Sequence, residues 1–207
     1  MKNLANYTVF NGTGVPAQAF TVATATDICT SEAHGLSDGD ALVLTTATTL
    51  PAGLSLLTEY YVISKTTNTF QLSTNVDGSA VDITTTGAGA HTYHLQGRKI
   101  YCGDADYINI TTYGNATCDM LVKVIGSTDE DAPNFGEVLS STNKYQYIDC
   151  IYLLDASSID GGTGFDPVES TVKQFSANVD GLSWITLGVP TYAAGLVKGE
   201  IILYSKN

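Results

Sequence analysis

Short runs of apolar residues, many of them alternating with polar ones, recur along the whole chain. No window keeps apolar residues at positions i, i+3, i+4 and i+7 without interruption by Gly, Pro or Thr clusters. The runs are instead rich in β-branched and aromatic residues, which favour strands. The sequence therefore predicts an all-β protein.

In the first half of the chain the predicted strands are short and separated by turn residues such as Asp38-Gly39 and Asp77-Gly78. This spacing is typical of a small barrel or sandwich. The predicted strands are AFTVA (19–23), DALVLTT (40–46), TEYYVIS (58–64), TFQLS (69–73), AVDIT (80–84) and AHTYHL (90–95).

In the second half the predicted strands are longer. In KYQYIDCIYLL (144–154), alternate residues fall on opposite faces and both faces are largely apolar, as in a strand covered on both sides. We therefore expect a two-layered, jelly-roll-like β-sandwich here. The other predicted strands are KIYCG (99–103), YINITT (107–112), TCDMLVKVI (117–125), STVKQFSA (170–177), SWITLGV (183–189) and GEIILYS (199–205).

A boundary between two domains is predicted near Gln96-Gly97. The favoured arrangement is an insertion, in which a small β module at 20–95 is set into a sandwich made by 1–19 and 97–207. The N-terminal run NYTVFNGTG carries a strand fragment with no evident partner. Its assignment to the sandwich rather than to the module is left open by the sequence.

Charge and cysteine content restrict which partners and which cellular compartment we expect for the protein. The net charge is −12, and only 14% of the residues are charged, so Thr, Ser, Asn and Gly must form much of the surface. Such an acidic chain repels phosphate backbones, which argues against nucleic acid as a partner. The N-terminus lacks a signal peptide and no run is long enough to span a membrane, so we expect a soluble protein made in the cytosol. Free thiols are then expected at Cys29, Cys102, Cys118 and Cys150.

Two motifs in the first half resemble catalytic or metal sites. Gly35-Leu-Ser37-Asp-Gly39 matches the G-x-S-x-G string of serine hydrolases, but a predicted strand follows it where that motif requires a helix. His34, His91 and His94 could join Cys29 around zinc. His91 and His94, however, lie three apart on a predicted strand and so point to opposite faces. We interpret Ser37 as part of a turn and the histidines as surface or turn residues.

The acidic and aromatic clusters are equally unspecific. The acidic loops lack the spacing of a calcium loop, and the Gly-rich segment 161–164 lacks the lysine of a phosphate loop. An aromatic sugar platform made by Trp184 with Tyr145, Tyr147, Tyr152 and Phe175 is an alternative to core packing. We therefore assign no catalytic, cofactor-binding or metal-binding residue. The acidic candidates are Asp104, Asp106, Asp129, Glu130, Asp131, Asp160 and Asp166.

One segment resembles a β module that recurs in bacteriophage virion proteins. The resemblance lies in His34-Gly-Leu-Ser-Asp-Gly-Asp40, the following ALVL, then LPAGLSLLTEYYVI, TFQLS and TTTGAGAHTY. In physical terms, Leu36 is an apolar plug, Gly39 permits a bend, and Leu42 and Leu44 fall on one strand face.

A second stretch, 107–207, is similar to small phage decoration, minor capsid or tail proteins. The similar segments are VKVIGSTDEDAPNF, TNKYQYIDCIYLLD, IDGGTGF, QFSANVDGLSWI and AGLVKGEIIL. These resemblances imply a non-enzymatic virion protein that assembles in the bacterial cytoplasm as a homo-oligomer beside major capsid or tail proteins. A capsid decoration or minor capsid role is favoured. A tail, baseplate or fibre-attachment component and a receptor- or glycan-binding module are the alternatives.

Overall fold

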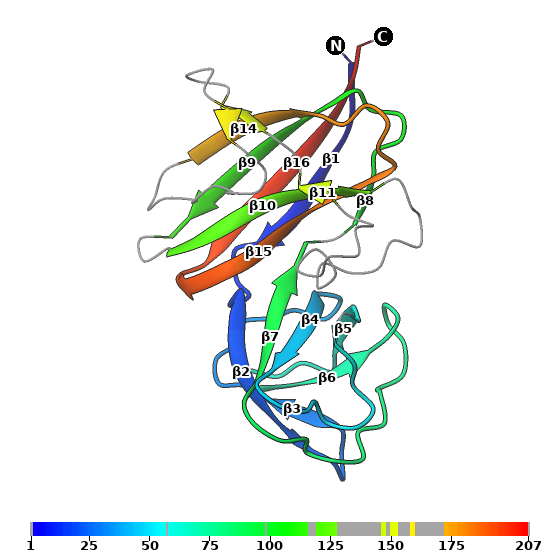
Figure 1. The fold of residues 1–207 in the computed structure, drawn as a ribbon, viewed down its shortest axis with the longest axis vertical. Helices are drawn as coiled ribbons and strands as arrows, with labels where there is room; N and C mark the ends of the chain where they lie inside the picture. Colours follow the sequence, from blue (N-terminus) through cyan, green and yellow to red (C-terminus); the bar gives the residue numbers. More distant parts are fainter. Residues whose placement is uncertain are drawn as a thin grey trace.

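The computed structural model describes residues 2–56, 58–97, 99–115, 119–127, 146–147, 150–152, 158–159 and 172–206. All regular elements in these ranges are β-strands, and the ranges contain no helix. The sequence prediction of an all-β protein is therefore confirmed for this part of the chain. Figure 1 shows two regions stacked along the long axis, a barrel below and a pair of sheets above.

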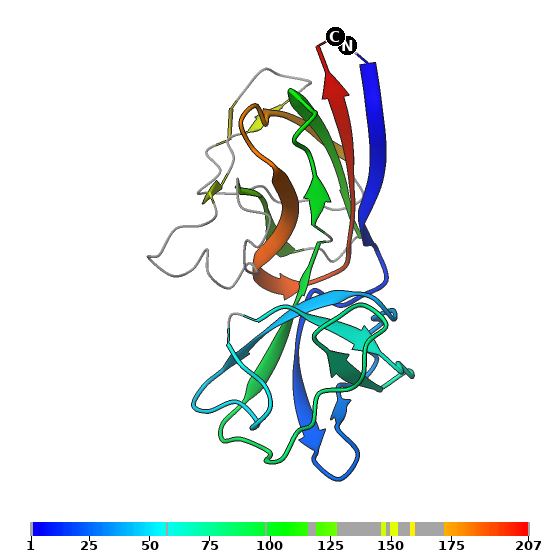
Figure 2. The same cartoon turned by 90° about the vertical axis from the view of Figure 1, so that its right-hand side faces the viewer.

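The lower region is a closed barrel of antiparallel strands (Figures 1 and 2). Closure comes from β7, which pairs with β2 along one edge and with β4 along the other. Around the barrel the order is β7-β2-β3-β6-β5-β4. The strands are β2 (Ala17–Ala23), β3 (Ile28–Thr30), β4 (Ala41–Thr46), β5 (Tyr60–Ile63), β6 (Thr69–Ser73) and β7 (His91–Gln96).

Alternate residues of each strand fill the barrel interior. In β4, Leu42 and Leu44 are 0% and 2% exposed, as their spacing predicts, and Leu36 at 1% is the plug that the sequence indicates. Gly39 has a φ of +89°, which confirms that a glycine is needed at this bend. Aromatic rings complete the core, with Phe20, Tyr60, Phe70 and Tyr93 all buried.

One strand predicted for this region is absent, and one observed strand was not predicted. The segment 80–84 is irregular backbone, held by hydrogen bonds from Val81 N to Leu72 O and from Thr84 N to Ala52 O. Its apolar residue Ile83 is fully buried, which explains the strand-like pattern. Conversely β3 was missed, because it is only three residues long and follows a turn that ends at Asp27.

The upper region has two layers that share one core (Figure 2). One layer is a six-stranded sheet in the order β1-β16-β9-β14-β12-β13. The other layer has the order β11-β10-β15, with β8 also on β15. The strands are β1 (Lys2–Asn11), β8 (Ile100–Tyr101), β9 (Tyr107–Gly114), β10 (Asp119–Ser127), β11 (Gln146–Tyr147), β12 (Cys150–Tyr152), β13 (Ser158–Ile159), β14 (Val172–Asn178), β15 (Trp184–Ala194) and β16 (Val197–Ser205).

The segment KYQYIDCIYLL is not one strand of one sheet. Gln146 and Tyr147, in β11, pair with β10 in one layer, whereas β12 pairs with β13 and β14 in the other. An alternating pattern marks strand residues but not the partner strand, so the pattern alone could not reveal the change of layer.

The two regions are joined through β1 and β7. Strand β1 pairs with β16 along almost its whole length, which supplies the partner of the N-terminal strand that the sequence left open. Gln96, at the end of β7, pairs with Gly188 of β15, and Gly97 N donates to Leu187 O. The barrel sheet therefore continues into the second layer of the upper region. The division into two domains at 20–95 and 97–207 remains a prediction.

Candidate functional site

The G-x-S-x-G segment forms a hydrogen-bonded turn that leads directly into β4. Asp40 Oδ2 accepts from Ser37 N at 2.8 Å, and Asp40 N donates to Ser37 O at 3.0 Å. The Ser37 hydroxyl accepts from Asn11 Nδ2 at 3.4 Å, so its contact is an amide of β1 and not an imidazole. The turn joins the barrel to β1 and, as described below, borders a cavity.

We expected the three histidines to be surface or turn residues; they lie in the barrel region, and His34 and His91 are buried there. His34 is fully buried: its Nδ1 accepts from Leu36 N at 3.0 Å and its Nε2 lies 3.3 Å from Thr69 O. His91 is also buried, because it points into the barrel. His94 lies on the opposite face of β7, as its spacing predicts, and bonds Thr45 Oγ1 at 3.1 Å.

Each of these histidines therefore contacts different partners, and they do not gather around Cys29. The described residues hold no group of three His, Cys, Asp or Glu side chains close enough to share a metal ion. Burial first, and then the nearby charge of Asp27, raise the pKa of the Cys29 thiol to about 12. Burial likewise raises the pKa of Cys102 to about 11, so both free thiols stay protonated and poorly reactive near neutral pH.

Only part of the other candidate clusters lies within the described residues. Asp106 accepts a hydrogen bond from Lys206 N at 2.6 Å, which ties it to the last strand. Phe175 is fully buried and so cannot belong to an exposed sugar platform, while Trp184 packs edge-on against Tyr101 at 5.4 Å. Outside the described residues or side chains lie Asp129, Glu130, Asp131, Tyr145, Tyr147, Tyr152, Asp160, the segment 161–164 and Asp166.

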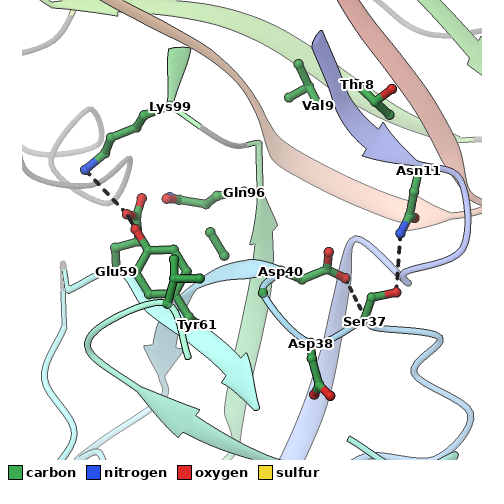
Figure 3. A pocket seen from close by; sticks show the side chains of 13 residues that line it. Thr8, Val9, Asn11, Ser37, Asp38, Asp40, Glu59, Tyr61, Gln96 and Lys99 are labelled. Atoms are coloured by element: carbon green, nitrogen blue, oxygen red, sulfur yellow. Dashed lines mark hydrogen bonds and ion pairs between the residues drawn. The ribbon is translucent and has the colours of Figure 1, made fainter. Parts of the chain in front are cut away.

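A cavity of about 640 Å³ lies where the barrel meets β1 (Figure 3). Its floor is a row of residues on three neighbouring strands: Ala41 of β4 pairs with Gln96 of β7 on one side and with Tyr61 of β5 on the other. All three side chains point outward from the barrel, since Leu42, Tyr60 and Leu95 point inward. The remaining lining residues are Thr8, Val9, Asn11, Ser37, Asp38, Gly39, Asp40, Glu59, Val76 and Lys99.

The cavity is polar and carries more acidic than basic groups. Glu59 Oε1 accepts from the Tyr61 hydroxyl at 2.5 Å and lies 3.5 Å from Lys99 Nζ. Burial raises the pKa of Tyr61, and the hydrogen bond to Glu59 adds to this shift. Burial also raises the pKa of Asp40, although its bond from Ser37 N acts in the opposite direction. With Asp38, the described lining residues include three carboxyl groups and one ammonium group.

Three polar atoms of this lining are buried without a hydrogen-bond partner among the described residues. They are Oε1 and Nε2 of Gln96 and Oε2 of Glu59. Gln96 is only 4% exposed, and Figure 3 shows its side chain extending from β7 on the Glu59 side of the cavity. Leaving a buried polar group unpaired costs about 1–3 kcal/mol, so such groups commonly mark a place where water or a ligand completes the contacts.

No pattern in the sequence indicates this cavity. Gln96 ends an alternating strand and stands at the predicted boundary, but its neighbours come from β1, β4 and β5 and from Lys99. No local spacing links these segments, because the strand pairings that bring them together are long-range.

Comparisons with known proteins add little to this geometry. No family model matches the sequence, and no curated protein matches it. A solved structure titled "Crystal structure of PBSX exported protein XepA" superposes with a TM-score of 0.38 at 8% identity, covering 98% of this chain and 85% of that one. A similarity at this level carries no argument about function. Among the described residues, none form a helix able to cross a membrane.

Proposed function

We propose that this protein is a non-enzymatic structural component of a bacteriophage virion, and that it docks through the outer face of its six-stranded sheet. We define this outer face by the side chains that point away from the core. They are Asn6 and Thr8 of β1, Glu200, Ile202 and Tyr204 of β16, Tyr107, Asn109 and Thr111 of β9, and Gln174, Ser176 and Asn178 of β14.

The near absence of net charge on the outer face is the observation that carries the proposal. Its charged side chains are Glu200 and Lys198, which alternate on the same face of β16 and pair at 2.8 Å, and Lys206, just after β16, lies over the ring of Tyr107. In a chain of net charge −12, a sheet face of hydroxyl, amide and aromatic groups loses its water at low cost compared with the rest of the surface. Depletion of charge at the centre is also what distinguishes protein interfaces from ordinary surfaces.

The sequence resemblances support the assignment to a phage virion. The 34–40 motif is similar to a phage virion module, and 107–207 is similar to decoration, minor capsid or tail proteins. In this proposal 1–19 and 97–207 form the jelly-roll-like sandwich domain that docks, and the barrel is displayed away from the particle. Many copies, each burying about 800 Å² per partner, would bind stably because the contacts add up across a lattice.

The favoured position is the outside of the capsid. The acidic surface disfavours contact with packaged DNA, and a docking protein needs neither a membrane nor a cofactor. A tail, baseplate or fibre-attachment component is the alternative within the same class, because the outer face fits a tail protein equally well.

The test combines copy counting with a charge placed on the outer face. We expect quantitative mass spectrometry of isolated heads and tails to find the protein in many copies on heads. Ile202→Lys puts an unpaired charge at the middle of the outer face, and we expect it to lower occupancy about tenfold or more, the effect of 1.4 kcal/mol. Leu56→Lys is the matched control, since Leu56 is 52% exposed and lies between β4 and β5 of the barrel, outside the six-stranded sheet.

Several outcomes would contradict the proposal. Absence of the protein from purified particles would remove the virion role. A small, fixed number of copies on tails would replace the decoration role by the tail alternative. Normal occupancy of the Ile202→Lys variant would show that another surface docks.

A further inference from the structure

Strand β1 borders the six-stranded sheet, and we call its side away from β16 the open edge. Among the described strands only β16 pairs with β1. The side chains of β1 do little to protect the open edge, because the strand contains no proline and Lys2 is its only charged residue. Leu4, an apolar residue of the same strand, is 38% exposed. The open edge is therefore suited to pair with a further strand.

Two bulges limit where a further strand can pair in regular register. The register between β1 and β16 shifts between Asn3 and Ala5 and again between Thr8 and Phe10. Between these shifts, the residues from Ala5 to Thr8 pair one by one with β16. Because bulges interrupt pairing at sheet edges, we expect an added strand to pair with Ala5–Thr8.

A second copy of the same segment matches Ala5–Thr8 on both faces of the sheet. Opposite residues of an antiparallel pair lie on the same face, so Tyr7 fits opposite Tyr7 of the second copy. Both rings then lie on the core side, where the half-buried Tyr7 already packs against the core. Asn6 lies opposite Thr8 of the second copy on the outer face, where an amide and a hydroxyl can form a hydrogen bond. Aromatic pairs and polar pairs of this kind stabilise antiparallel strands.

Charge favours the antiparallel orientation over the parallel one. Lys2 lies at one end of β1, and the turn at 34–40 lies beside the other end and carries the exposed side chain of Asp38. Antiparallel pairing brings Lys2 of each copy towards Asp38 of the other, whereas parallel pairing brings the two Lys2 side chains together. Lys198 also lies near that second end, but it is on the outer face and is paired with Glu200 at 2.8 Å.

From these observations we propose that two copies of this chain pair through the open edge of β1 as an antiparallel dimer with two-fold symmetry. The two six-stranded sheets then form one continuous sheet with both outer faces on the same side. Figure 1 shows that β1 runs from the end where both termini lie towards the barrel, so this end of each copy is directed towards the barrel of the other. The pairing uses the edge of the sheet and not its outer face, so it does not depend on the docking role.

Analytical ultracentrifugation of the purified full-length protein tests the proposal in solution, without phage particles. We expect an equilibrium between monomer and dimer with a Kd of about 10 μM or lower. Hydrogen exchange at protein concentrations well below and well above this Kd locates the interface. We expect amide protection in β1 to rise at least about threefold with concentration, while protection in β9 stays unchanged.

Charge substitutions test the register of the two strands. Asn6→Lys combined with Thr8→Lys places like charges directly opposite one another, and we expect the Kd to rise at least about tenfold. Asn6→Glu combined with Thr8→Glu should have the same effect alone. A mixture of the two variants should form a heterodimer, because each lysine then lies opposite a glutamate. Gln174→Lys combined with Ser176→Lys has the same spacing on β14 and is the matched control, which should dimerise as the wild type does.

Several results would overturn the proposal. A protein that stays monomeric at about 100 μM would exclude the dimer. A dimer that persists in both charged variants would place the contact on another surface. A mixture that forms no heterodimer would contradict the antiparallel register with Tyr7 at the axis. If the charged variants do not fold, hydrogen exchange of the wild-type protein decides, since protection in β1 that does not change with concentration would exclude the pairing.

Discussion

In the barrel every strand has a neighbour on both sides, because β4 returns to pair with β7 and closes the ring. In the six-stranded sheet, β1 pairs with β16 along one edge, and none of the described strands pairs along its other edge. Closure leaves the barrel without an open sheet edge, whereas the outer edge of the ten-residue strand β1 has no partner among the described strands. The two regions therefore differ in whether a further strand could pair with them.

Truncating a large aromatic side chain in one core is expected to have the largest effect, and it tests whether the two regions unfold independently. Phe70 is 1% exposed and contacts the rings of His34 at 5.2 Å and Tyr93 at 5.8 Å. We expect Phe70→Ala to lower the free energy of unfolding by about 3–5 kcal/mol in urea titrations. In hydrogen exchange, the loss of protection should be confined to β2–β7.

Phe175→Ala is the matched change in the sheets, since Phe175 is also fully buried. We expect the reverse pattern of exchange, with β9 and β16 exposed and the barrel protected. Equal loss of protection in both regions for either variant would mean that the chain unfolds as one cooperative unit.

A smaller effect is expected at the turn that links the barrel to β1. Gly35 has a φ of +62°, and a Cβ at this position would overlap the carbonyl oxygen of Thr13. We expect Gly35→Ala to destabilise the protein by about 1–3 kcal/mol, measured by thermal or urea unfolding.

Gly39→Ala separates the two causes of that cost. Gly39 has a φ of +89°, but a Cβ there has open space around it, so only backbone strain of about 1–2 kcal/mol applies. If both variants lose the same stability, the contact between Gly35 and the Thr13 segment contributes nothing.

Acid is expected to weaken the barrel more than the sheets, and this is the mildest of the effects. All three histidines lie in the barrel, and burial lowers the pKa of both His34 and His94. The unfolded chain, with histidine pKa values near 6.5, then binds more protons than the folded one, so stability is full above about pH 6.5 and declines as the pH falls below it.

Hydrogen exchange at about pH 7.5 and about pH 5.5 measures this decline, after correction for the intrinsic exchange rate at each pH. We expect protection to fall in β4 and β7 and to stay unchanged in β9. Staying above about pH 5.5 limits the opposite contribution of Asp40, whose carboxyl pKa is raised by burial. His94→Gln should reduce the pH dependence of protection in β4 and β7. Protection that falls equally in β9 would contradict the assignment to the barrel.

Local pattern predicted the parts of the fold that depend on near neighbours. The alternation of Leu42 and Leu44, the plug at Leu36 and the bend at Gly39 are all as the sequence indicates, because strand pleat and turn geometry act over a few residues. The segment at 80–84 failed, since one buried side chain, Ile83, gives irregular backbone the appearance of a strand.

Long-range pairing explains the rest of what the sequence could not reveal. The division of 144–154 between two layers depends on which strands receive it, and no residue within the segment encodes that choice. The cavity is a similar case. Gln96 and Tyr61 become neighbours only because their strands, β7 and β5, both pair with β4. The sequence alone therefore could not predict that the two side chains line the same cavity.

The pairing of Lys2 with Ser205 has a consequence for biosynthesis. During translation the barrel has all its strands once Gln96 has left the ribosome, and it can collapse early. Strand β1 leaves the ribosome before the barrel strands and its partner β16 long after them, so β1 stays unpaired while the whole segment between them is synthesised. We expect the upper region to mature only after β16 has been made, and any chaperone that binds the nascent chain to recognise the unpaired β1.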